Sequence, residues 1–313
     1  MGVRRAIGID IGGTKIAGLL VDEDGTVHER IERDTPAEDV DATLERIHAV
    51  GAELAGDAVA IGVGAAGMVD FDSGMMRSAP NLAWREVPIR DLVSERVGLP
   101  CLLDNDANAA AWGEFRYGAA REFDQAILVV TVGTGIGGGI IADGHLYRGA
   151  HGFGAEIGHI IVEPGGPLCG CGNRGCWEQV ASGRALDRLG TAAAEKDRTI
   201  LISRLAAGNP VSGRYVADAA RREDAIAVGI FEEVGRRLGE GIAGLVNVLD
   251  PEAVVVGGGV AEEGDLILEP ARRAFLEAVE APEHRPEVPI LQAALGNDAG
   301  AIGAAALALE TLG

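Results

Sequence analysis

Two periods of hydrophobic and polar positions alternate along the chain, and they predict strands and helices in turn. Short apolar, β-branched segments predict strands at 4–11, 15–21, 26–33, 58–64 and 100–104. Apolar residues at helical spacing predict a helix from Pro36 to near Gly56 and another over 87–97, with a loop from 65 to Asn81. Because strands and helices alternate, we expect an α/β fold.

The second half of the chain repeats this pattern of strands and helices. The strand 126–132, a glycine-rich turn and Ile140-Ile141 copy the arrangement of residues 6–20, which predicts two related lobes that face each other across a cleft. An i, i+4 apolar ridge predicts a buried helix over 226–246, followed by a strand at 253–256 and a last helix from Asp298. We expect a small lobe of residues 1–118, completed by the C-terminal helix 299–313, and a large lobe of residues 119–298.

Three of the four cysteines lie in one Gly- and Pro-rich segment, residues 156–178. Its candidate metal ligands are His159, Cys169, Cys171 and Cys176. One imidazole and three thiolates are the donor set that Zn²⁺ prefers in closed structural sites. A disulfide is the alternative, but a Cys-x-Cys bridge is strained and a single cluster is not typical of a secreted framework. The segment therefore predicts zinc, with Glu156 and Glu178 outside the ligand pattern.

The composition narrows the class of protein. A formal net charge of −21 over 313 residues argues against nucleic acid as a partner, because phosphate neutralisation needs a basic surface. We expect no membrane partner and no signal peptide, and a reducing cytoplasm is the simplest compartment for a thiolate metal site. Only Lys15 and Lys196 are lysines among 27 basic residues. Such an acidic, lysine-poor surface favours a halophilic origin, and a GC-rich genome that prefers arginine codons is the alternative.

Three glycine-rich turns at strand ends predict phosphate binding. The first, Asp10-Ile11-Gly12-Gly13-Thr14-Lys15, offers a carboxylate, backbone amides, a hydroxyl and an ammonium. It is not a Walker A loop, because the chain continues into a strand, which is the hairpin arrangement of actin-like ATPases. The other turns are Gly133-Thr134-Gly135 and Gly257-Gly258-Gly259. Together the three could surround a nucleotide.

Polar side chains also gather at the junction between a predicted strand and helix, residues 103–109. They are Asp104, Asn105, Asp106 and Asn108. One of them can cap the helix, but four exceed what a cap requires, and ligands bind at the carboxyl ends of strands in α/β sheets. Asp106 is therefore our candidate base for a substrate hydroxyl.

These motifs resemble those of the ROK family of sugar kinases, and most closely its microbial glucokinases. The resemblance spans almost the whole chain and is carried by residues 10–15, 103–114, 131–139 and 154–178, the last being the most specific signature. The continuation 178–186 is similar to the glucokinase branch and favours glucose. The family implies a two-lobed, actin-like (ribonuclease H-like) fold with a structural zinc loop.

The resemblance also implies which residues hold the ligands. Those implied for the sugar are Gly67, Asn81, Asn105, Asp106, Glu156, His159 and Glu178. Those implied for the nucleotide are Asp10, Gly12, Gly13, Thr14, Lys15, Thr134, Gly135, Gly257, Gly258 and Gly259. Fixed amides and carboxylates can distinguish one hexose epimer from another, and His159 would use one ring nitrogen for zinc and the other for a sugar hydroxyl.

The reaction implied is transfer of the γ-phosphoryl group of ATP to the 6-hydroxyl of glucose, with Asp106 as base. Mg²⁺ would bridge the phosphates, with Asp10 near it through water. Other hexoses stay open, namely N-acetylmannosamine, N-acetylglucosamine, fructose and allose, as do polyphosphate as donor and a non-catalytic sugar sensor. A repressor of the family would carry a helix-turn-helix before Asp10, where only nine residues precede. We expect a homo-oligomer, a dimer or a tetramer.

Overall fold

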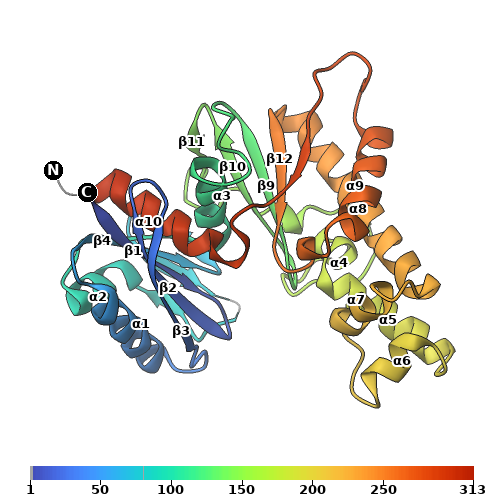
Figure 1. The fold of residues 1–313 in the computed structure, drawn as a ribbon, viewed down its shortest axis with the longest axis horizontal. Helices are drawn as coiled ribbons and strands as arrows, with labels where there is room; N and C mark the ends of the chain where they lie inside the picture. Colours follow the sequence, from blue (N-terminus) through green and yellow to red (C-terminus); the bar gives the residue numbers. More distant parts are fainter. Residues whose placement is uncertain (1–2, 80) are drawn as a thin grey trace. The chain divides into compact units, whose positions relative to one another are not determined.

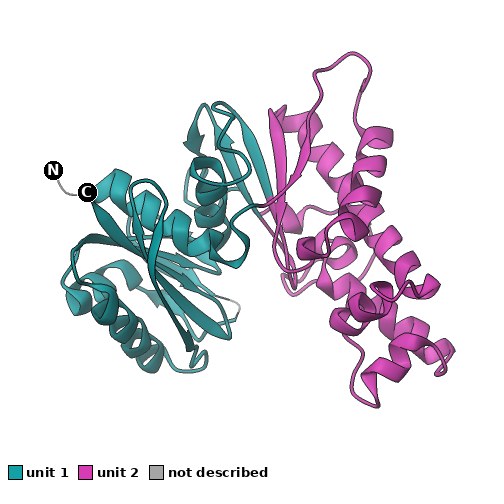
Figure 2. Ribbon diagram, viewed as in Figure 1, with its two compact units in different colours: residues 1–129, 138–155, 294–313 teal, residues 130–137, 156–293 magenta. Residues whose placement is uncertain are grey.

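The computed structural model describes residues 3–79 and 81–313 (Figure 1). The chain divides into two compact units (Figure 2). Unit 1 comprises Met1–Val129, Gly138–Ala155 and Ala294–Gly313, and unit 2 comprises Val130–Gly137 and Glu156–Ala293. The lobe boundaries expected from the sequence, after residues 118 and 298, stay a prediction.

A five-stranded sheet forms the centre of unit 1, with the order β3-β2-β1-β4-β8 among the described residues. Its strands are β1 (Arg5–Ile11), β2 (Lys15–Asp22), β3 (Val27–Asp34), β4 (Ala58–Ala65) and β8 (Cys101–Asn105). The first three pair antiparallel, whereas β1, β4 and β8 run parallel. The parallel strands end at one edge, where Asp10, Gly64 and Asp104 form a row across the sheet.

Helices cover both faces of this sheet (Figure 1). They are α1 (Val40–Leu54) and α2 (Ile89–Val97) on one face and α10 (Ala299–Leu312) on the other, with α3 (Asp106–Arg116) packed against α10. Because side chains alternate along a strand, Ile7 and Ile9 pack toward α1 while Ala6 packs toward α10. Gly8 and Gly62 let α10 lie directly on the sheet, since a Cβ there would stand 1.8 and 1.9 Å from helix carbonyl oxygens.

A small sheet was not expected from the sequence. Strands β5 (Met68–Asp70), β6 (Met75–Ser78) and β7 (Arg85–Val87) pair in that order, within a stretch that the sequence assigned mainly to a loop. These strands are too short for an alternating pattern to show. Helix α1 also begins later than expected, after Asp39, whose side chain accepts a hydrogen bond from the Ala42 amide and caps the helix.

The second large sheet has the order β11-β10-β9-β12-β13 among the described residues. Its strands are β9 (Ile127–Val132), β10 (Ile136–Ala142), β11 (His145–Leu146), β12 (Ala253–Gly257) and β13 (Ile290–Gln292). The order is analogous to that of the first sheet, with an antiparallel β10-β11 pair on one side and a parallel β12-β13 pair on the other. This analogy agrees with the repeat seen in the sequence.

Helices make up most of unit 2, while the second large sheet has strands in both units (Figure 2). The helices of unit 2 are α4 (Glu178–Ala181), α5 (Gly183–Lys196), α6 (Leu201–Ala206), α7 (Gly213–Ala220), α8 (Ala225–Leu249) and α9 (Asp265–Ala278). Among the described residues, 3-10 turns lie at η1 (Ile157–His159) and η2 (Ala261–Glu263) in unit 2 and at η3 (Gly296–Asp298) in unit 1. The predicted ridge of α8 is buried from Ile230 onward, but Ile226 is 43% exposed. The α/β fold class is confirmed. Among the described helices, none combines the length and the apolar character needed to cross a membrane.

Candidate functional site

In unit 1, two carboxylates lie at the carboxyl edge of the sheet. Asp10 is near the end of β1, and Asp106 opens α3 directly after β8. Burial, with a further contribution from the charge of Asp106, raises the pKa of Asp10 to about 7. Burial also raises the pKa of Asp106, against backbone amides at the helix start that lower it. Two acids that resist ionisation side by side are typical of a functional site.

The neighbours of Asp106 hold it in place. Asn105 is the cap of α3, because its Oδ1 accepts hydrogen bonds from the amides of Ala107 and Asn108 at 2.8 and 3.2 Å. Asp104 is buried and accepts hydrogen bonds from Asn108 Nδ2 and from Arg148 Nε at 3.0 and 2.7 Å. Asn105 thus caps the helix and Asp104 is anchored by Arg148, while the Asp106 carboxylate itself interacts with amides at the start of α3.

Other residues predicted for ligands in unit 1 have partners of their own. The Gly67 carbonyl accepts a hydrogen bond from Asn105 Nδ2 at 3.1 Å, so these two predicted sugar contacts are joined to each other. Asn81 is exposed and lies against Gly13. The amide of Gly12 closes the first glycine turn on the Lys15 carbonyl at 2.9 Å. Thr14 is exposed.

The side chain of Lys15 is more occupied than the sequence suggested. Its Nζ lies 2.6 Å from Glu32 Oε1, and the pair is mostly exposed. The hydrogen bond with Glu32 raises the pKa of Lys15, so the ammonium stays charged. A phosphate contact from Lys15 stays a prediction.

In unit 2, the predicted metal ligands lie together. One ligand atom from each of His159, Cys169, Cys171 and Cys176 lies within 4.8 Å of all the others. Two of the separations are 3.6 Å, from Cys169 Sγ to His159 Nδ1 and from Cys171 Sγ to Cys176 Sγ. All four cysteines of the chain are free thiols, so the disulfide alternative is not realised. The cluster is a candidate metal centre.

The acidic residues that flank this cluster face it. His159 turns Nδ1 toward Cys169, and its Nε2 lies 4.0 Å from Glu156 Oε2. Glu178 Oε1 lies 3.1 Å from Cys169 Sγ and accepts a hydrogen bond from Gln179 Nε2 at 2.9 Å. The structure therefore brings Glu156, His159 and Glu178 close to the cluster in unit 2, and their contact with a sugar stays a prediction.

A cavity of about 550 Å³ lies in unit 2 beside the second glycine turn. Its lining includes Gly133, Thr134, Gly183, Leu186, Asp187, Ser212, Gly213, Arg214 and Gly259. Thr134 and Gly259 thus share one cavity, and their role in nucleotide binding stays a prediction. Gly258, by contrast, is packed on the Val132 backbone, with φ +88. The Thr134 carbonyl lies 2.9 Å from the hydroxyl of Ser182, which also lies 2.5 Å from the Glu178 carbonyl.

Sequence reasoning missed the wall of this cavity formed by α5 and α7. Asp187 Oδ1 accepts a hydrogen bond from the Gly213 amide at 2.5 Å, and Ser212 precedes α7 without using its hydroxyl as a cap. The pair Ser212-Gly213 was a readable helix start. Nothing in the local pattern, however, indicated that this start faces Thr134.

Comparison with known proteins gives these sites a context. A model of the ROK family matches residues 6–311. The chain belongs to the ROK family. It is 44% identical to a glucokinase of Streptomyces coelicolor, with 97% of each chain covered. It is also similar to a ROK family glucokinase of Streptomyces griseus, solved in complex with glucose and AMPPNP, at 44% identity and a TM-score of 0.89, with 98% and 99% of the two chains covered.

The ROK family also contains regulators. A xylose repressor of Bacillus spizizenii is 30% identical over 97% of this chain, which covers 77% of the repressor. This kinase-like chain and the regulator therefore share the ROK part, and the match leaves 23% of the repressor uncovered.

Proposed function

We propose that this ROK protein is a glucokinase that transfers the γ-phosphoryl group of ATP to the 6-hydroxyl of glucose. The observation that carries the proposal is its similarity, over almost the full chain, to a glucokinase solved with glucose and AMPPNP. The presence of Asp106, a Cys/His cluster with flanking acids, and a cavity beside Thr134 supports the same function. A non-catalytic sensor would not need a buried carboxylate held at a helix start.

In this proposal Asp106 is the base. Phosphoryl transfer passes through a loose transition state, so alignment of the hydroxyl contributes more than covalent chemistry does. Burial raises the pKa of Asp106, which makes it a better proton acceptor than an exposed aspartate. Glu156, His159 and Glu178 would bind sugar hydroxyls, with Asn81, Asn105 and Gly67 as further contacts. The cavity lined by Thr134 and Gly259 would hold the nucleotide, and Gly12 to Lys15 would contact its phosphates.

The Cys/His cluster fits zinc. Tetrahedral Zn²⁺ with ordinary bond lengths separates two sulfurs by about 3.8 Å and a sulfur from a nitrogen by about 3.6 Å. The observed separations of 3.6 Å for both kinds of pair match those values. Four protein ligands leave no open position, so we assign the ion a structural role. Nδ1 of His159 would bind it, and Nε2–H would face Glu156 and the sugar.

The site also suits Mg²⁺ near Asp10. The pKa of Asp10 is raised to about 7 by burial and by Asp106, and a divalent cation with its water would relieve both effects. When bound with ATP, the ion would neutralise phosphate charge. The chain's own contribution is to hold the carboxylates at the sheet edge.

A coupled assay tests the proposal. The purified protein is given glucose, N-acetylmannosamine, N-acetylglucosamine, fructose or allose, each with ATP, ADP or polyphosphate. We expect the highest kcat/KM for glucose with ATP. A higher value for another hexose or for polyphosphate would reassign the substrate or donor, and no turnover with any pair would refute a kinase. A cytoplasmic homo-oligomer, dimer or tetramer, completes the proposal, and gel filtration with light scattering tests the assembly.

A further inference from the structure

The base of the metal-binding segment, residues 156–178, is closed by its own backbone. The amides of Val162 and Glu163 both donate to the Gly175 carbonyl, at 2.9 and 3.1 Å. Ile161 and Cys176 form an antiparallel bridge beside them. The outgoing and returning halves of the segment therefore meet next to Glu163. A contact that fixes Glu163 therefore restrains the outgoing and the returning half of the segment together.

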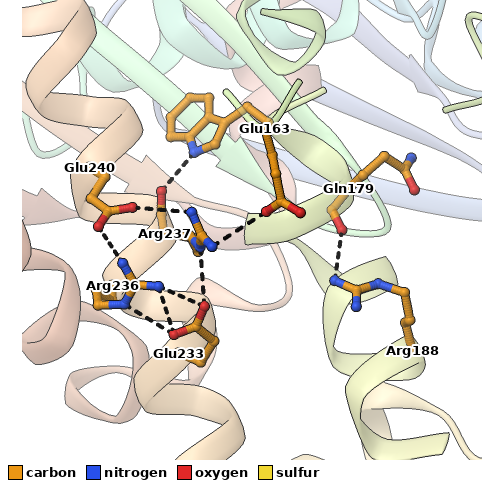
Figure 3. A network of polar contacts seen from close by, with 8 residues as sticks. Glu163, Gln179, Arg188, Glu233, Arg236, Arg237 and Glu240 are labelled. Atoms are coloured by element: carbon orange, nitrogen blue, oxygen red, sulfur yellow. Dashed lines mark hydrogen bonds and ion pairs between the residues drawn. The ribbon is translucent and has the colours of Figure 1, made fainter. Parts of the chain in front are cut away.

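One residue of α8, Arg237, contacts both halves (Figure 3). Its Nη2 lies 3.4 Å from Glu163 Oε2 on the outgoing half. Its carbonyl accepts a hydrogen bond from Trp177 Nε1 at 3.0 Å on the returning half. Trp177 is fully buried, and a Cβ at Gly241 would stand 2.1 Å from its ring, so the indole is clamped against α8. Glu178 follows Trp177 directly.

Neighbouring carboxylates on α8 direct the Arg237 side chain. Glu233 Oε1 lies 3.1 Å from Arg237 Nε, and Glu240 Oε2 lies 3.7 Å from Nη1 (Figure 3). Arg236 binds the same two carboxylates, with Glu233 at 2.7 Å. Among the described residues, the ion-pair partners of Arg236 are both on α8, whereas Arg237 also reaches Glu163. The two arginines thus form a natural comparison.

We propose that Arg237 is a positioning residue for sugar binding, which acts by holding the base of the metal-binding segment through Glu163. The inference rests on the proposed function of that site. Sugar affinity requires Glu156, His159 and Glu178 to present their hydrogen-bonding atoms together, and ordering a loose segment on binding costs affinity. The lining of the cavity beside Thr134 contains no residue of this segment, so we expect the contact to change nucleotide affinity less than sugar affinity.

The test uses Arg237→Gln and Glu163→Gln, with Arg236→Gln as the matched control. For the zinc-loaded full chain we expect the KM for glucose to rise about fivefold in both test variants and less than about twofold in the control, the scale of a partly exposed ion pair. The KM for ATP should change less than the KM for glucose. The double variant should show no more than the effect of Arg237→Gln alone, because that substitution already breaks the ion pair that Glu163→Gln removes. The zinc content and the Tm of each variant are also measured.

A second readout is independent of catalysis. The rate at which zinc passes to a chromogenic chelator should rise in Arg237→Gln and Glu163→Gln and not in Arg236→Gln. Equal effects of Arg236→Gln and Arg237→Gln, additive effects in the double variant, or an unchanged KM for glucose would each overturn the proposal. If the wild type fails to phosphorylate glucose, the proposed function fails by itself, and the order of the zinc release rates still decides whether Arg237 holds the segment.

Discussion

Glu114 on α3 is a buried carboxylate that accepts hydrogen bonds from backbone amides. Its side chain is 1% exposed, and its two oxygens accept hydrogen bonds from the amides of Ala119, Ala294 and Leu295 at 2.8, 3.0 and 2.8 Å. It thereby fixes the chain just before α10. Each such hydrogen bond to a charged group contributes about 1.5–3 kcal/mol, and an orphaned buried amide costs about 1–3 kcal/mol.

The substitution Glu114→Gln puts an NH₂ group in place of one accepting oxygen. At best the remaining oxygen keeps the amides of Ala119 and Ala294, while the amide of Leu295 faces another donor. We expect the free energy of unfolding to fall by about 2–4 kcal/mol. The matched control is Glu310→Gln, which breaks an exposed pair with Arg116 and should cost less than about 1 kcal/mol. Urea denaturation followed by circular dichroism measures both, and equal midpoints for the two variants would refute the reasoning.

Four further predictions concern the site and the surface. Asp106→Asn should keep glucose binding by calorimetry while kcat falls about 10³-fold, and ample residual turnover would rule Asp106 out as base. Cys171→Ser should lose zinc and glucose affinity together by metal analysis and calorimetry; full activity without metal would refute the site. Because the folded pKa of Asp10, about 7, exceeds its unfolded value of 3.8, the protein without ligands should lose stability as pH rises from 4 to 7, by at most about 4 kcal/mol, and Asp10→Asn should flatten that slope in urea titrations. The acidic surface predicts a Tm that rises toward molar KCl, and a protein most stable in dilute buffer would end the halophilic hypothesis.

The sequence was most informative where a local pattern decides the structure. Apolar runs between glycine turns located the strands of the first sheet and β9, β10 and β12 of the second, because burial of a strand requires that pattern, whereas the short edge strands β11 and β13 were not predicted. The cluster of His159 with three cysteines could be predicted because metal chemistry fixes the donor types and the segment is short. Asp106 could be proposed as the base because it follows the end of a parallel strand, and that role stays a prediction.

The features that could not be predicted from the sequence depend on contacts between segments far apart in the chain. The wall of the cavity near Ser212 comes from helices whose local pattern reports only their own burial. The ion pair between Glu163 and Arg237 joins residues far apart in the chain, and no motif around either residue indicates the other as its partner. Asn105 and Gly67 were each predicted as sugar contacts, but their mutual hydrogen bond needed coordinates.

The placement of α10 has a consequence for biosynthesis. This helix covers the face of the first sheet that presents Gly8 and Gly62, yet it is made nearly three hundred residues after β1. During translation the apolar surface of that face stays exposed until α10 has left the ribosome, whereas α8 and α9 can already pack together. Nascent chains stalled before residue 299 should therefore recruit chaperones more strongly than full-length chains.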